Sequence, residues 1–105
     1  MGKNIVLIGM PGVGKSTSGV ILAKVMNYDF LDSDLVIQQQ TKKLLKEIIR
    51  EEGIDGFNAV ENQINAGIDV ENTVIATGGS VIFGADAMAH FKETGIVVYL
   101  RISYD

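Results

Sequence analysis

The 105-residue sequence contains no cysteine and only one histidine. The lack of cysteine excludes disulfides, thiol nucleophiles and cysteine-ligated metals, and a single histidine excludes a histidine-rich metal site. No apolar run approaches the roughly 20 residues that span a bilayer, and the N-terminus lacks the h-region and cleavage site of a signal peptide. We therefore expect a cytoplasmic protein with no membrane partner.

Positive charge is also scarce. The formal net charge is −4, which argues against a broad surface for nucleic acid or anionic lipid, so any phosphate binding must be local. The 47% apolar content is sufficient for a globular core, and there is no internal repeat or Pro/Ser-rich linker. Residues 1–105 are expected to form one domain.

The most informative segment is GMPGVGKST, residues 9–17, which matches G-x-x-x-x-G-K-[ST] at every fixed position. Its glycines allow successive backbone N–H groups to face a polyphosphate at the start of the following helix. Lys15 is expected to reach the terminal phosphates, and the Ser16 hydroxyl to coordinate Mg²⁺. The predicted nucleotide-binding residues are Gly12, Val13, Gly14, Lys15, Ser16 and Thr17.

Strand and helix patterns alternate along the chain. Strands are predicted at 4–8, 28–31, 73–77 and 96–100, the last two of the buried type, and helices at 17–26, 35–40, 41–52, 57–68 and 85–93. In helix 41–52, an apolar stripe of Leu44, Leu45, Ile48 and Ile49 precedes a stop at Gly53. The alternation predicts a parallel sheet with helices on both faces, the three-layer α/β fold of P-loop NTPases.

Polar residues follow two of these strands. Asp32 and Asp34, at i and i+2, point to the same side in extended chain, where they would face Mg²⁺ and an acceptor, although either residue alone could be a helix cap. Gly78 and Gly79 follow strand 73–77 and indicate either close approach to a ligand or a tight turn. Asn58, one turn before Glu61, is predicted to point toward the same pocket as Asp34.

Across residues 3–100, these motifs together resemble the shikimate kinases, a family of P-loop small-molecule kinases. The resemblance rests on four segments. GMPGVGKST is the phosphate-loop motif, and FLDSD (30–34) stands at the position of the family's D-x-D. FNAVE (57–61) stands at the position of F-R-x-x-E, and VIATGGS (74–80) at that of a strand that ends in three glycines. Two positions depart from the pattern: Asn58 replaces the family's arginine, one of the groups that bind the substrate carboxylate, and Ser80 replaces the third glycine.

The resemblance implies phosphoryl transfer from ATP, with Mg²⁺, to a hydroxyl of shikimate or a similar small molecule. Lys15 and Asp34 would be catalytic, and Asp32 would hold Mg²⁺ together with Ser16. The acceptor would meet Asp34, Asn58 and the segment Gly78–Gly79–Ser80.

Two alternatives remain open: a P-loop kinase for another acceptor such as gluconate or a nucleotide, and a non-catalytic nucleotide-binding module. Members of the family continue into an arginine-bearing lid and a fifth strand, so the chain corresponds to their N-terminal portion. If the sheet order follows the family, with the first strand between the third and the fourth, strand 96–100 is an apolar edge, which we expect to be covered by a second copy, a domain swap or a further segment.

Overall fold

A computed structural model describes residues 3–9, 15–78 and 81–100. Its centre is a four-stranded parallel sheet in the order β2-β3-β1-β4. The strands are β1 (Asn4–Gly9), β2 (Asp29–Asp32), β3 (Thr73–Ala76) and β4 (Gly95–Leu100). The first strand lies between the third and fourth, which confirms the sheet order expected from the family resemblance.

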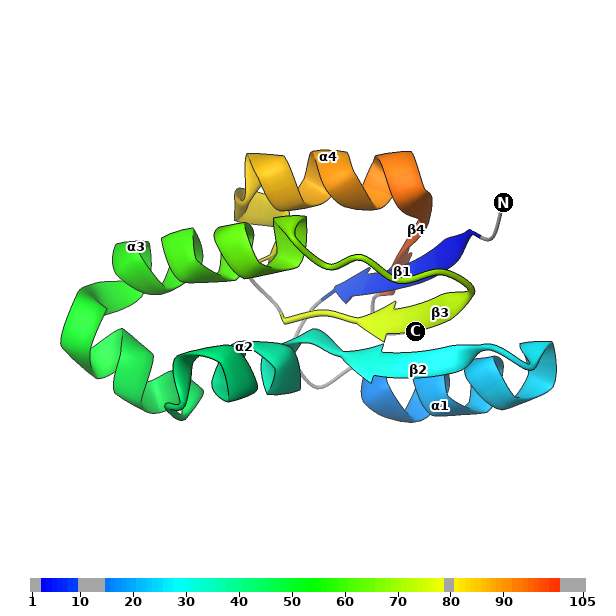
Figure 1. Ribbon diagram of the computed structural model, residues 1–105, viewed down its shortest axis with the longest axis horizontal. Helices are drawn as coiled ribbons and strands as arrows, with labels where there is room; N and C mark the ends of the chain where they lie inside the picture. Colours follow the sequence, from blue (N-terminus) through cyan, green and yellow to red (C-terminus); the bar gives the residue numbers. More distant parts are fainter. Residues whose placement is uncertain (1–2, 10–14, 79–80, 101–105) are drawn as a thin grey trace, which may run out of the picture.

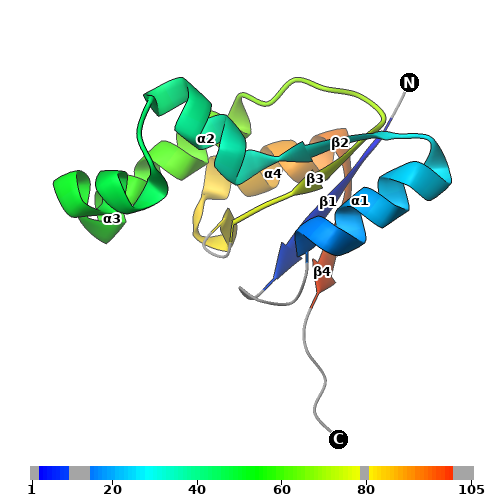
Figure 2. The same cartoon turned by 90° about the horizontal axis from the view of Figure 1, so that it is seen from below.

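Helices cover both faces of this sheet (Figures 1 and 2). They are α1 (Lys15–Met26), α2 (Ser33–Thr41), α3 (Leu45–Ala66) and α4 (Ala85–Thr94), with a short 3₁₀ helix, η1 (Val81–Phe83), before α4. Among the described residues, no helix combines the length and apolarity that crossing a membrane requires. The layers are those of the predicted three-layer α/β fold.

The core follows the alternation of side chains along the strands. Toward α4, residues of β1 and β3 pack around the fully buried Phe91, and toward α1 the residues between them pack around Ala23. The strand residues of the first face include Val6, Ile8 and Ile75, and those of the second include Leu7 and Val74. Strands buried on both faces explain the nearly continuous apolar runs in the sequence.

Strand β4 departs from its expected burial. Among the described strands it pairs with β1 alone, in register from Asn4 with Gly95 to Gly9 with Leu100. Ile96 is 57% exposed and Tyr99 is 52% exposed. The apolar sequence of β4 indicated a buried strand, whereas its exposure is that of the apolar edge expected from the family's sheet order, because no described strand pairs with its outer side.

The boundary between α2 and α3 also differs from the prediction. Helix α2 continues to Thr41 and ends at Lys42 in the left-handed conformation (φ 60°), so α3 begins only at Leu45. Leu44 becomes the residue before the helix and is 50% exposed, and Ile49 is 39% exposed. Of the predicted apolar stripe, only Ile48 is fully buried, against α2 and the second half of α3.

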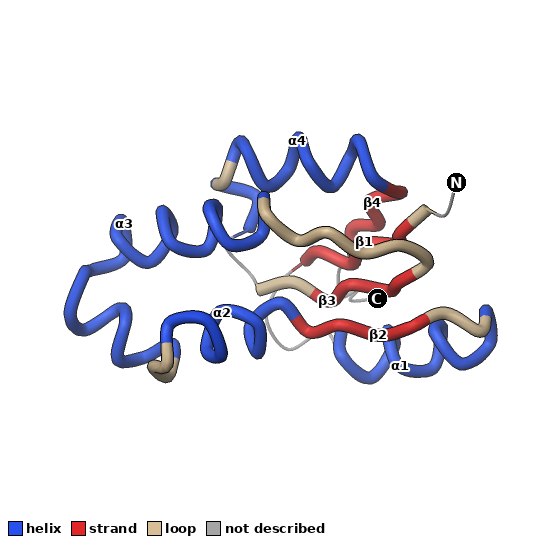
Figure 3. The backbone as a smooth tube through the Cα atoms, viewed as in Figure 1, coloured by secondary structure: helices blue, strands red, loops and turns tan. Residues whose placement is uncertain are grey.

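A kink divides α3. Gly53 has φ 75° and ψ 175°, outside helical values, inside the run from Leu45 to Ala66. The predicted interruption at Gly53 is confirmed, although the two halves meet directly at a bend. Figure 3 shows the second half turning back toward the sheet.

Candidate active site

The C-terminal ends of β1, β2 and β3 meet at one edge of the sheet, beyond which α2 and α3 project (Figure 1). The register places Asp32 of β2 beside Ala76 of β3, and Ala76 beside Leu7 of β1. In open α/β sheets, ligands bind at this edge. The predicted acidic residues and glycines therefore reach the same side of the molecule.

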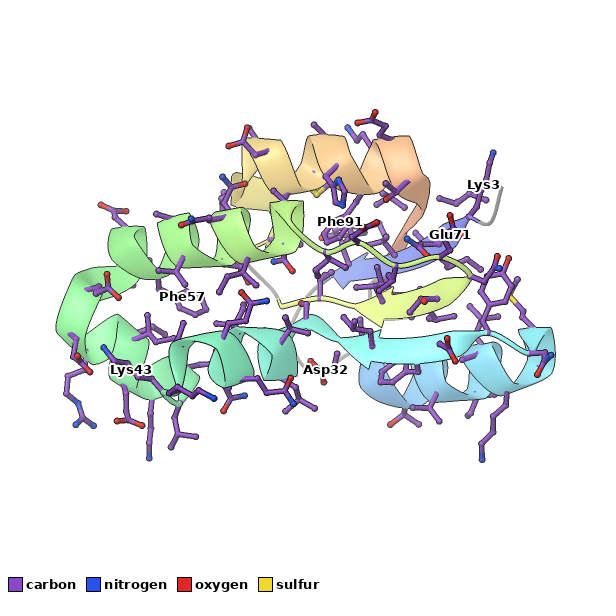
Figure 4. The ribbon with its side chains drawn as sticks, in the orientation of Figure 1. Lys3, Asp32, Lys43, Phe57, Glu71 and Phe91 are labelled. Atoms are coloured by element: carbon purple, nitrogen blue, oxygen red, sulfur yellow. The ribbon has the colours of Figure 1, made fainter. Side chains whose placement is uncertain are left out.

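Asp32 lies at the junction of β2 and α2 (Figure 4), where its carboxylate accepts a hydrogen bond of 2.9 Å from the backbone N–H of Asp34. Asp32 is therefore the N-cap of α2, the alternative considered for one of the two aspartates. Asp34 lies in the first turn of that helix. The expectation that both aspartates share an extended segment was wrong, because the helix begins at Ser33 rather than at Leu35.

The side chains of Asp34 and Glu61 both approach the backbone of Gly78. A β-carbon built on Gly78 would lie 2.8 Å from Asp34 Oδ1 and 2.8 Å from Glu61 Oε2, closer than side chains tolerate. Both carboxylates thus reach the backbone directly after β3, from two different helices. The structure thus shows close approach of two side chains to Gly78, while the approach of a ligand there stays a prediction.

Glu61 was not predicted as a site residue, although it is 1% exposed and belongs to this cluster. A signal was present: Glu61 lies three residues after Asn58, so the two face the same side of α3. Thr77, which was not predicted from the sequence, fixes the backbone before Gly78 against β1. Its backbone N–H and its hydroxyl both donate to the carbonyl of Leu7, at 3.1 and 2.9 Å.

Asn62 fixes the helix that carries Glu61. Its Oδ1 accepts from the backbone N–H of Ala87 at 2.8 Å, and its Nδ2 donates to Asp86 Oδ2 at 3.0 Å. Both partners belong to the first turn of α4. Because α4 packs on the sheet, this contact positions α3, and hence Glu61, relative to β3.

Two further amides lie on the same side of α3 as Glu61. Asn65, one turn later, is 0% exposed, and neither of its amide atoms has a hydrogen-bond partner among the described residues. Asn58, one turn earlier, is half-buried, and its buried Oδ1 likewise accepts no hydrogen bond from them. The orientation of Asn58 toward the same pocket as Asp34 stays a prediction.

Much of the predicted phosphate loop, residues 10–14, lies outside the described residues, as do Gly79 and Ser80. So the geometry of Gly12, Val13 and Gly14 is not described. Helix α1 begins at Lys15, as the motif requires, but the side chains of Lys15 and Ser16 also lie outside the description. Thr17, in the first turn, is exposed.

The acidic side chains of the described residues can be compared with the ligands that Mg²⁺ requires. Within the described ranges, no three His, Cys, Asp or Glu side chains gather as a metal site. Mg²⁺ bound with a nucleotide needs only one or two carboxylates, since phosphate oxygens and waters supply the other ligands. The single carboxylate of Asp32, at the end of β2, fits that requirement.

Comparison with known proteins agrees with this geometry. The family model described as shikimate kinase matches residues 11–105. Shikimate kinase 2 of Yersinia pseudotuberculosis serotype O:3 (strain YPIII) is 37% identical over 103 residues, which are 98% of this chain and 59% of the relative. Shikimate kinase 2 of Yersinia enterocolitica is also 37% identical, with the same coverage.

Solved structures give the same result. A shikimate kinase from Acinetobacter baumannii, in complex with shikimate, superposes with a TM-score of 0.87 at 36% identity and covers 96% of this chain. A shikimate kinase from Aquifex aeolicus superposes with a TM-score of 0.81 at 29% identity. The chain spans 57% and 61% of these two structures, and less than two thirds of the curated relatives. From its motifs, its strand order and a family match over most of its length, we conclude that the chain belongs to the shikimate kinase family.

Proposed function

We propose that this chain provides the nucleotide and acceptor sites of a kinase that transfers the γ-phosphoryl group of ATP to a hydroxyl of shikimate or a similar small molecule. The observation that carries the proposal is that the carboxylates of Asp34 and Glu61 both approach Gly78. Gly78 follows the C-terminal end of β3, on the same side of the sheet as the phosphate-loop sequence that connects β1 to α1. Because ATP is the donor, we also propose that the protein acts in the cytoplasm.

In this reaction the acceptor oxygen forms a bond to the γ-phosphorus as the bond from that phosphorus to the bridging oxygen breaks, which releases ADP. Asp34 would orient the acceptor hydroxyl and take its proton. Lys15 would hold the terminal phosphates and Thr17 would support the start of α1. Mg²⁺, held by Ser16 and Asp32, would neutralise phosphate charge.

The acceptor ring would lie against the backbone at Gly78, where the structure leaves no room for a side chain. Asn58, Gly79 and Ser80 are proposed to complete this pocket. Such transfer depends on positioning and charge neutralisation more than on covalent chemistry, so a few well-placed groups are sufficient.

The test combines binding and turnover. We expect calorimetry to detect MgADP, and a coupled assay to detect ADP release that requires shikimate. Asp34→Asn should lower turnover by about 100-fold or more while leaving MgADP affinity unchanged, because it removes the base but no phosphate contact. ADP release with gluconate or a nucleoside monophosphate, but not with shikimate, would identify the other kinase class instead.

A second candidate, a nucleotide-binding module without catalysis, is favoured by one observation: the relatives extend well beyond the matched region, since this chain spans 59% of their length. This candidate predicts that Lys15→Ala abolishes MgADP binding while no acceptor triggers ADP release. Acceptor-dependent release would exclude it.

We further propose that a second copy of the chain covers the edge strand β4. The strand sequence GIVVYL contains no charged residue or proline that would discourage edge pairing. A groove of about 430 Å³ continues this apolar surface between β4 and α1 and is lined by Ile21, Val25 and Val98. The same strand from a second molecule would satisfy the edge hydrogen bonds and cover the groove across a two-fold axis.

A further inference from the structure

Two adjacent residues of α3 contact opposite ends of the segment that connects β3 to α4. Glu61 approaches Gly78, where the segment begins. Asn62 contacts Gly84, where the segment ends, and a β-carbon built on Gly84 would lie 2.6 Å from Asn62 Oδ1. Figure 1 shows this part of α3 beside the start of α4. The second half of α3 therefore touches both ends of the connection between the proposed acceptor site and α4.

Backbone hydrogen bonds link the two ends of this segment to each other. The N–H of Val81 donates to the carbonyl of Gly78 at 3.4 Å, and the N–H of Gly84 donates to the carbonyl of Val81 at 2.9 Å. The side chain of Val81 is buried in the same core cluster as Phe91 of α4. Because a packed turn transmits a displacement rather than absorbing it, a shift of Gly84 is expected to move Gly78.

Asn62 acts as the N-cap of α4 although it belongs to a different helix. Gly84, the residue before α4, has no side chain with which to satisfy the N–H groups of the first turn. Asn62 Oδ1 instead accepts from the N–H of Ala87, the third residue of α4, at 2.8 Å. This is the hydrogen bond that an N-cap side chain normally accepts. The amide group of Asn62, which also donates to Asp86, thus completes α4 and fixes Gly84 against α3.

We propose that Asn62 is a positioning residue for the acceptor site. Its cap on α4 holds Gly84 against α3, and the turn through Val81 then holds Gly78 at Glu61. This inference rests on the proposed function for the location of the acceptor site at Gly78. It assigns a role in acceptor binding to a side chain whose own hydrogen bonds go to α4.

The test compares acceptor affinity with nucleotide affinity. Asn62→Ala removes both hydrogen bonds to α4 and should weaken shikimate binding to the MgADP-saturated chain by about 10-fold, because small displacements of binding groups are costly. MgADP affinity should stay unchanged, because neither α3 nor α4 carries the phosphate-loop sequence. Gln63→Ala changes the next residue of α3, which is exposed, and should alter neither affinity. Calorimetry measures both affinities.

Two further variants separate the cap from the loss of a side chain. Gly84→Ala leaves Asn62 in the sequence but displaces its amide, so it should reproduce the loss of shikimate affinity. Asn62→Asp places a carboxylate beside Asp86 and should also weaken shikimate binding through like-charge repulsion. Adding Asp86→Asn to it exchanges amide and carboxylate between the two helices and retains both hydrogen bonds. This double variant should recover the affinity to within about 2-fold.

Amide exchange of Ala87 reports on the cap itself. Its N–H should lose protection in Asn62→Ala and Gly84→Ala, and keep it in the double variant with exchanged side chains. Unchanged protection in Asn62→Ala would overturn the inference, as would lost protection with unchanged shikimate affinity. Failure of the double variant to recover, or an equal loss of MgADP affinity, would overturn it as well.

The unmodified chain distinguishes failure of this inference from failure of the proposed function. If it binds MgADP but not shikimate, the proposed acceptor site fails and the inference fails with it, while the nucleotide site stands. If it binds both ligands and Asn62→Ala binds them equally well, only the role of Asn62 is refuted.

Discussion

Gly78 and Gly67 differ in what a side chain would meet. A β-carbon on Gly78 would lie 2.8 Å from two carboxylate oxygens, whereas one on Gly67 would meet backbone oxygens at ordinary distances of 3.6 and 3.7 Å. Gly78→Ala should therefore displace Asp34 and Glu61 and weaken acceptor binding by about 10- to 100-fold, with MgADP affinity unchanged. Calorimetry measures both affinities. Gly67→Ala is the control, and an equal effect of the two substitutions would refute this account.

Asp32 caps α2 and is proposed to hold Mg²⁺, and two substitutions can separate these roles. Asp32→Asn keeps an oxygen that accepts from the Asp34 N–H, so we expect nearly unchanged stability but a weaker dependence of nucleotide affinity on Mg²⁺. Asp32→Ala also removes the cap and should cost about 1 kcal/mol of unfolding free energy. Urea denaturation measures the stability of each variant, and calorimetry with and without Mg²⁺ measures the second effect. If Asp32→Asn binds MgADP like the unmodified chain, Asp32 is a cap alone.

For single residues, the sequence indicated which side chains approach one another better than it predicted their backbone conformation and burial. The i, i+2 spacing of Asp32 and Asp34 suggested a shared extended segment, but the helix begins between them, because a capping aspartate favours helix over strand at that point. Glu61 was missed as a site residue because a glutamate on a helix is usually solvent-exposed, and only the tertiary contact with Gly78 reveals its burial.

Among the elements, α3 depends on one residue for its shape. Gly53 has φ 75° and ψ 175°, values that cost an ordinary residue about 1–3 kcal/mol, although open space surrounds it. Gly53→Ala should therefore lower the unfolding free energy by about that amount through backbone strain alone. Urea denaturation of Gly53→Ala, beside Gly67→Ala, measures it. A variant as stable as the unmodified chain would mean that the kink relaxes into a straight helix.

The strands and their order were predictable, while the helix boundaries were less so. Buried runs such as TVIA, residues 73–76, have few interpretations other than a parallel strand. The segment between α2 and α3 was misassigned because Leu44 and Ile49 fit an apolar helical stripe, yet this helix pair projects beyond the sheet and has little to pack against. Periodicity identifies an apolar face, but tertiary packing decides how much of it is covered.

For the whole molecule, association through β4 can be tested by charge. Val98 is 36% exposed and lines the groove beside α1, so Val98→Lys should block pairing of this edge and give a monomer. Ile54→Lys is the control, since Ile54 is 67% exposed on the distant α3. Sedimentation velocity should show a dimer for the unmodified chain and for the control. A monomeric unmodified chain with rapid amide exchange along β4 would contradict the proposal.

The contact of Gly9 with β4 has a consequence for the interpretation of related sequences. Gly9 has φ +150°, and a β-carbon there would clash with the carbonyl oxygen of Leu100. A sequence that keeps this strand register is therefore expected to keep glycine at that position, even if it has ceased to use ATP. The first glycine of the phosphate-loop pattern is thus diagnostic of how β1 and β4 pack, and evidence that a homologue still binds nucleotide must come from the residues after it.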